Sequence, residues 1–315
     1  MRRIFFSLLL LTDANLFSEN FWEVYTEIGA HVENYRYSAP FLFYNTFQDI
    51  KWKAAALDSC IGLKVAPQEG RLAHMVFQIE GGGILYGKGY DFKGNIQENA
   101  FSVFTNEKSH NSKIYGEYFE TSLGYEYLVC SAFSITAKAG YLLQNRRFHN
   151  SRSIFTSPED SLNYTIENFR DNKLYQDGWI GIQSKYYFMP CMLMKADLEY
   201  HCGYVKGDTK WNSEQSSTDG FSALAAGKVN TKKSVYEGLK VKLGWEYDLW
   251  EGCIIGLNGY YQYYISKHSN DSLQISQTLI NNSGTIIGQS SNSSPLTGKI
   301  DWQMYSVSAT FGIYF

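Results

Sequence analysis

Proline and long apolar runs are both scarce in this sequence, and each scarcity argues against a class of protein. The 315 residues contain 5 prolines against 27 glycines, a balance that suits long strands with glycine turns better than helices. Beyond Ser18 no apolar run approaches the roughly 18 residues that a membrane-spanning helix needs. The formal net charge of −3 gives no reason to expect nucleic acid as a partner.

Aromatic residues, by contrast, are abundant, with 25 Tyr, 20 Phe and 7 Trp. Tyr is common in strands and at membrane interfaces, because its ring is apolar while its hydroxyl stays hydrated. The mean hydropathy of −0.30 does not mark a membrane protein. A transmembrane β-barrel would not be revealed by this value, because half of every strand faces a polar interior.

The N-terminus is typical of a secretory signal. Arg2 and Arg3 form a basic region, and an apolar stretch follows from Ile4 to Leu11. Small residues lie further on, which predicts cleavage between Ala14 and Glu19. We therefore assign residues 1–18 to a signal peptide and residues 19–315 to one exported domain. The alternative is a buried N-terminal segment.

Two-residue alternation dominates the chain from Phe21 onward, over runs longer than ordinary globular strands. In the first run Trp22, Val24 and Ile28 share one face, while Glu23 and Glu27 share the other. Similar runs recur to the end of the chain, about ten in all. The last one places apolar or aromatic residues at every second position from Tyr305 to Phe315. Such an ending resembles the terminal strand by which outer-membrane barrels are recognised for assembly.

The connections between these runs alternate strictly between short and long. Short turns are predicted near 66–71, 128–132, 189–192 and 249–253, and long polar segments near 36–48, 88–112, 150–176, 206–232 and 267–300. Outer-membrane barrels have short periplasmic turns and longer outer loops. The sequence therefore predicts an all-β fold, a transmembrane antiparallel up-and-down β-barrel of about ten strands in the bacterial outer membrane, with outer-membrane lipid as a partner.

The faces predicted to point inward carry many charges. The closest arrangement to a site is a lumen charge cluster, in which Asp197, Glu199 and His201 share one face of one strand. Its members are Glu80, Lys195, Asp197, Glu199 and His201. A binding site or a proton relay is one interpretation. We favour ion-paired filling of a narrow lumen, because buried charges must be paired. No metal site and no cofactor are predicted.

Five cysteines give an odd count in a chain predicted to be exported. Cys130, Cys191 and Cys253 each lie in or beside a different short turn, whereas Cys60 and Cys202 lie within strands. Successive short turns are two strands apart, roughly 10 Å, and a disulfide needs Cα atoms closer than about 7 Å. The hypothesis is that these rim thiols form disulfides with neighbouring envelope proteins. The alternative is that turns simply tolerate these small residues.

Several features resemble the omptin family of outer-membrane barrels, whose members are endopeptidases. The segment from Gly89 to Phe92 resembles the omptin segment that carries a catalytic Asp-x-Asp pair, with Asp91 at the second Asp and Gly89 in place of the first. The stretch from Gly203 to Val205 resembles the approach to the omptin Asp-x-His pair, and Asp208 follows. No His occurs between His201 and His268, so the general base of that mechanism is missing. Asp91 and Asp208 remain the weak catalytic candidates.

In overall character the chain also resembles the outer membrane proteins of Protochlamydia and related chlamydiae, some of which are regarded as porins. About ten strands lie close to the barrel size that side chains fill, which argues against a wide diffusion pore. The sequence therefore predicts a structural, surface or narrow-pore (porin-like) role without peptidase activity. The alternative is an omptin-type outer-membrane endopeptidase.

Overall fold

The predicted ten-strand antiparallel barrel is confirmed. The structure is a computed structural model that describes residues 20–38, 46–67, 72–97, 105–156, 163–189, 191–216, 222–250 and 252–314. The predicted signal segment and the terminal Phe315 lie outside these residues. The described residues form the strands β1 (Asn20–Ser38), β2 (Thr46–Pro67), β3 (Met75–Gln97), β4 (Thr105–Cys130), β5 (Phe133–Thr156), β6 (Asn163–Met189), β7 (Met192–Ser216), β8 (Ser222–Trp250), β9 (Cys253–Ile280) and β10 (Ile286–Tyr314). No helix in the described part of the chain is long and apolar enough to cross a membrane.

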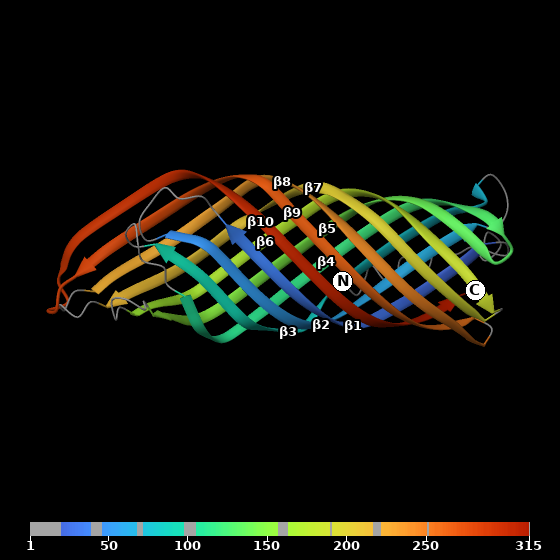
Figure 1. Cartoon of the computed structure of the whole chain (residues 1–315), viewed down its shortest axis with the longest axis horizontal. Helices are drawn as coiled ribbons and strands as arrows, with labels where there is room; N and C mark the ends of the chain where they lie inside the picture. The colour runs from blue at the N-terminus through green and yellow to red at the C-terminus, as the bar shows by residue number, and fades with distance from the viewer. Residues whose placement is uncertain are drawn as a thin grey trace, which may run out of the picture.

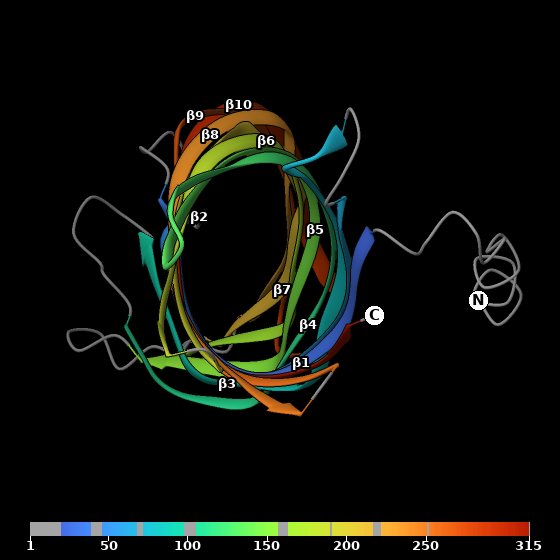
Figure 2. The same cartoon turned by 90° about the vertical axis from the view of Figure 1, so that its right-hand side faces the viewer.

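Each strand pairs antiparallel with its neighbours in the sequence, and β1 closes the barrel against β10. The closing ladder runs from Glu23 opposite Tyr314 to Ser38 opposite Lys299. The strands incline steeply to the long axis, and the view turned by 90° shows them as one closed ring (Figures 1 and 2). Closure satisfies the backbone groups of every strand within the membrane, where lipid offers no hydrogen-bond partner.

Both ends of the strand sequence lie at the end of the barrel that carries the short turns, since the start of β1 pairs with the end of β10. In outer-membrane barrels this is the periplasmic end. The turn between β8 and β9 illustrates why glycine is needed there. Gly252 has a φ of 84°, a left-handed conformation that other residues adopt only with strain.

The long polar connections predicted from the sequence are mostly wrong, because the strands continue through them. The β9 and β10 strands, for example, extend from both sides into the segment 267–300 and leave only residues 281–285 between them. Toward the outer end of the barrel the strands keep their two-residue alternation, but the apolar side chains now face the lumen and the polar ones face outward. On β2, Ile50 and Trp52 are buried inside, whereas Lys51 and Lys53 are exposed. Water in place of lipid on the outside explains this reversal.

Nearer the periplasmic end the same strands show the polarity that was predicted. Val24 and Ile28 of β1 are exposed on the lipid-facing side, and Leu57 and Ile61 of β2 lie beside them. These exposed apolar side chains form a lipid-facing band, because the surrounding bilayer acts as their apolar solvent. The lumen therefore has two parts, a charged periplasmic half and an outer half rich in buried rings, and these two parts define the candidate site.

Candidate functional site

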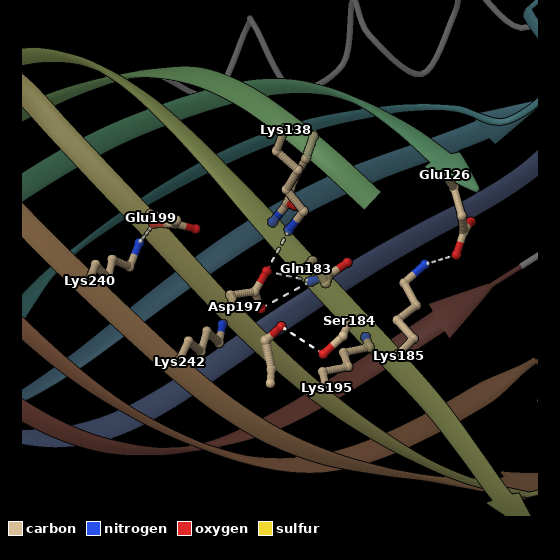
Figure 3. A network of polar contacts seen from close by, with 12 residues as sticks. Glu126, Lys138, Gln183, Ser184, Lys185, Lys195, Asp197, Glu199, Lys240 and Lys242 are labelled. Carbon is tan, nitrogen blue, oxygen red and sulfur yellow. Dashed lines mark hydrogen bonds and ion pairs between the residues drawn. The ribbon is translucent and has the colours of Figure 1, made fainter. Parts of the chain in front are cut away.

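The periplasmic half of the lumen is filled by paired charged side chains, which we call the lumen network. They occupy the inward positions of strands β1 to β8, and part of the network is drawn in Figure 3. The members are Glu23, Glu27, Lys64, Glu80, Glu120, Glu126, Lys138, Lys185, Lys195, Asp197, Glu199, Lys240, Lys242 and Glu246.

All five residues of the predicted lumen charge cluster point into the barrel, but they bind different partners. Asp197 accepts a hydrogen bond of 2.9 Å from Lys138 Nζ and one of 2.8 Å from Gln183 Nε2. Lys195 forms an ion pair with Glu246. Asp197 and Lys195 are thus each paired with an opposite charge on another strand, as burial of charge requires. The cluster's members are bound mostly to residues outside the cluster, so it is not one convergent site.

Glu80 is held by hydroxyl groups. Its two carboxylate oxygens accept hydrogen bonds of 2.6 Å from Tyr25 and 2.5 Å from Tyr118. The Tyr25 ring reaches this position because it lies directly over Gly62, where a Cβ atom would come within 2.2 Å of the ring. A larger residue at position 62 would displace Tyr25 and leave one side of the buried carboxylate without its donor.

His201 lies between two carboxylates. Its Nδ1 is 2.8 Å from Asp177 Oδ1, and its Nε2 is 3.3 Å from Glu199 Oε2. Tyr264 and Tyr236 complete the group, with the Tyr264 hydroxyl 3.2 Å from Nδ1 and the Tyr236 hydroxyl donating to Asp177. A His–Asp pair of this kind can orient a general base. Here both side chains are 0% exposed, so no substrate reaches them in this conformation.

Several lumen pairs join strands that are far apart around the ring. Lys240 of β8 binds Glu120 of β4 at 3.3 Å and Glu199 of β7 at 3.2 Å. Lys242, two positions along β8, binds Glu27 of β1 at 3.1 Å. The Lys240–Glu199 pair joins neighbouring strands, but the pairs with Glu120 and Glu27 cross the lumen and hold its walls at a fixed separation.

A further cross-lumen pair marks the boundary with the outer half. Glu33 of β1 is fully buried, and its carboxylate lies 3.0 Å from Arg146 of β5 and 2.9 Å from His31. It also accepts a hydrogen bond of 3.3 Å from Trp302 Nε1 on β10. The Arg146 guanidinium lies over the Trp302 ring, 5.4 Å from its centroid. Glu33 thus connects the charged half of the lumen to the rings above it.

Above this boundary, buried rings cross the lumen in a group that we call the aromatic layer. Tyr35, Trp52 and Phe148 stack with centroid separations of 4.9 and 4.6 Å. Trp302 lies 5.2 Å from Tyr175 and 5.3 Å from Tyr264. The full layer is Tyr35, Trp52, Phe148, Tyr175, Tyr236, Tyr264 and Trp302. The sequence analysis did not predict this layer. A signal for it was present, because Tyr35 and Tyr37 are aromatic residues on the opposite face of the strand from Val32.

The spaces left in the lumen are small. A cavity of about 90 Å³ lies within the lumen network, and one of about 60 Å³ adjoins it, since Glu80, Glu120 and Lys240 border both. Within the aromatic layer the space that Tyr35, Trp52, Phe148, Tyr175 and Trp302 enclose falls to about 10 Å³. That volume holds about one water molecule. The layer is therefore the narrowest part of the lumen that these cavities describe.

Asp208, one of the two weak catalytic candidates, does not come together with His201. Asp208 lies on the outer face of β7, where its carboxylate binds Lys210 at 2.8 Å. Asp91 belongs to β3, and its side chain lies outside the described part of the chain. Among the described residues, no group of three or more His, Cys, Asp or Glu side chains is placed to hold a metal ion.

The three rim cysteines differ in exposure. Cys130 is exposed at the end of β4, Cys191 is half-buried, and Cys253 is buried at the start of β9. All three are free thiols, as are Cys60 and Cys202. Of the three, Cys130 therefore has the thiol most accessible to a neighbouring protein.

The comparison with one solved structure agrees with this geometry. The fold is similar to the outer membrane protease OmpT of Escherichia coli, with a TM-score of 0.60 and 13% identity over 95% of this chain and 98% of that one. A FadL homologue of Pseudomonas aeruginosa matches with a TM-score of 0.30 and 8% identity over 93% of this chain and 90% of that one. No curated protein matches the sequence.

A family comparison gives the assignment. Residues 32–315, nearly the whole barrel, match the family described as Protochlamydia outer membrane protein. Together with the closed ten-strand architecture, this match places the protein in the bacterial outer membrane. The chain belongs to the Protochlamydia outer membrane protein family.

Proposed function

We propose that this protein is a surface and structural barrel whose lumen is closed to solutes. The observation that carries the proposal is the aromatic layer, in which five of the seven rings border a space of only about 10 Å³. Because this space holds about one water molecule, it offers no room for a hydrated ion or a small solute. The cross-lumen pairs below the layer add a second obstruction.

Conductance in a planar lipid bilayer tests the proposal directly. The refolded protein is expected to insert without producing steady current steps, because the aromatic layer leaves no continuous water path. Folding is checked in the same sample by the gel shift between heated and unheated protein. Reproducible single-channel openings from the folded barrel would contradict the closed lumen.

A narrow pore is the second candidate, and the charged cavities favour it. The two cavities of about 90 and 60 Å³ adjoin each other within the lumen network and are lined by charged groups that ions or water could follow. Such a pore needs the aromatic layer to move aside. The bilayer experiment distinguishes the candidates, since a pore of this kind shows at least intermittent openings.

The omptin-type peptidase has the weakest support. OmpT of Escherichia coli is described as a protease, but its likeness to this chain at 13% identity concerns the fold alone. Here the buried His201–Asp177 pair is inaccessible, and Asp208 is bound to Lys210 on the outer face. Cleavage of a fluorogenic peptide by the folded barrel would be needed to revive this alternative.

Disulfide links to neighbouring envelope proteins remain a proposal, for which Cys130 is the best placed thiol. We expect Cys130→Ser to remove disulfide-linked species from non-reducing gels of intact outer membranes, because the exposed thiol is the one that partners can reach. Cys253→Ser is the matched control at a buried thiol and is expected to leave the pattern unchanged. A wild-type chain that migrates only as a monomer would disprove the links.

A further inference from the structure

At the outer end of the barrel, one side of a strand has no partner strand among the described residues. We call the segment Ile286–Thr297 of β10 the outer edge. On one side it pairs with β9, from Gly288 opposite Leu279 to Thr297 opposite Asn270. On the other side the described part of β1 begins to pair only at Ser38, opposite Lys299. Among the described residues, one side of the outer edge thus has no strand partner.

The outer edge is held in place by an ordered turn. Between β9 and β10 the Asn281 side-chain oxygen accepts hydrogen bonds of 3.1 Å from the Ser283 amide and 2.9 Å from the Thr285 amide. Gly284 supplies the left-handed conformation, with a φ of 77°. The hairpin projects farthest from the periplasmic end, as the red and orange strands show (Figure 1). An edge that is already extended costs less ordering entropy when a strand pairs with it.

The composition of the outer edge departs from the usual protection of exposed edges. Exposed edge strands are commonly blocked by charges, prolines or bulges. No residue of Ile286–Thr297 is charged. A bulge lies at its tip, between Ile286 and Gly288, and Pro295 lies near its base. Between them the segment from Gly288 to Ser294, roughly 23 Å long, has no such protection.

The position of Pro295 indicates which amides face outward. Proline has no N–H and is tolerated in an edge strand where that position faces away from the ladder. Residues two apart have the same orientation along a strand, and no register shift is found between Gly288 and Gly298. Gln289, Ser291 and Ser293 therefore direct their N–H and C=O groups toward the unpaired side. These groups form a regular row that another backbone strand can match.

We propose that the outer edge binds an extended, uncharged polypeptide segment of another exported protein by strand addition. Backbone hydrogen bonds supply the affinity in this mode of recognition, and side chains on the two faces supply the selectivity. The exposed side chains of the central segment are Gln, Ser and Asn, which favour cross-strand partners such as Ser and Thr. This interaction does not depend on whether the lumen conducts.

A second copy of the chain fits the outer edge poorly. Two copies in one membrane are related by an axis along the membrane normal. Strands of such barrels tilt by about 40°, so rotation about that axis makes two equivalent strands cross at about 80°. A continuous ladder needs nearly aligned strands. Self-association is therefore treated as an outcome of the test and not as the proposal.

The test measures binding of a fluorescein-labelled peptide of alternating threonine and serine to the full-length folded barrel by fluorescence anisotropy. We expect Ser291→Pro to weaken binding by about tenfold or more, because it removes one outward N–H and disturbs its neighbours. Ser291→Thr is the matched control and is expected to bind like the wild type. The same peptide with every second amide methylated is expected not to bind.

The heat-dependent gel shift shows whether the Ser291→Pro barrel is folded. On the folded wild type, the contact is located by hydrogen exchange with and without peptide, measured at the amides of Gln289, Ser291 and Ser293. Absence of binding, equal binding by Ser291→Pro, or equal binding of the methylated peptide would overturn the proposal. Sedimentation of the wild type as a dimer that Ser291→Pro dissociates would also overturn it and would assign the edge to a second copy.

Discussion

Replacement of Glu33 by Gln is expected to destabilise the folded barrel by about 3 to 5 kcal/mol, the usual cost of removing one partner from a buried ion pair. The Glu33 carboxylate is fully buried and binds Arg146 at 3.0 Å and His31 at 2.9 Å. The neutral amide would keep the shape of the side chain but leave the Arg146 charge in the lumen without its counter-charge. Urea unfolding of the barrel in lipid vesicles measures the change.

Two controls separate this effect from a general loss of charge. Glu117→Gln removes a carboxylate on the outer surface, where Glu117 and Arg147 are 71% and 55% exposed, and is expected to change stability by no more than about 1 kcal/mol. The double variant with Glu33→Gln and Arg146→Met removes both buried charges and is expected to be more stable than Glu33→Gln alone. If Glu33→Gln unfolds like Glu117→Gln, the cross-lumen pair does not stabilise the barrel.

Truncation of the aromatic layer is expected to have the second large effect, the conversion of a silent barrel into a conducting one. The ring centroids of Trp302 and Tyr175 lie 5.2 Å apart beside the smallest of the described lumen cavities, and both side chains are almost completely buried. The double variant Trp302→Ala and Tyr175→Ala removes two rings that face the same small cavity. We expect steady single-channel openings in a planar bilayer, where the wild type gives none.

This truncation also costs stability, of order 3 to 5 kcal/mol for each large aromatic side chain. The gel shift on heating shows whether the variant is folded, and Phe148→Ala, on the other side of the same cavity, is a milder second variant. Trp250→Ala makes the same chemical change at a side chain that is 66% exposed and is the matched control, expected to stay silent. Folded variants of the layer that remain silent would place the block in the lumen network instead.

Much of the fold follows from two-residue periodicity. In the membrane-spanning part of β1, Val24 and Ile28 alternate with Glu23 and Glu27, and the structure places these two sets on the lipid and lumen sides. Lipid outside a narrow lumen imposes this pattern locally, so each strand reveals it without reference to the others. Strand number follows in the same way.

The outer half of the barrel shows where this reasoning failed. On β10, Ile300 and Trp302 are buried inside, while Asp301 lies between them on the outer side. Alternation is present, but its polarity is the reverse of that in the segment from Tyr305 to Ile313. If a strand is recognised only by apolar residues at its lipid-facing positions, such a stretch is predicted to be a polar loop. The strands were therefore ended too early, and the aromatic layer was missed.

Taken alone, the sequence determined that this is a ten-strand outer-membrane barrel and that charged residues such as Asp197 and Glu199 face its interior. Those properties depend on contacts with lipid or water, which act on each strand separately. Only the tertiary structure decided which charges pair across the lumen, that rings from β1, β2, β5, β6, β8, β9 and β10 meet in one layer, and that β10 extends beyond β1. Such contacts depend on strand register and barrel curvature, which bring together residues as distant in sequence as Glu33 and Trp302.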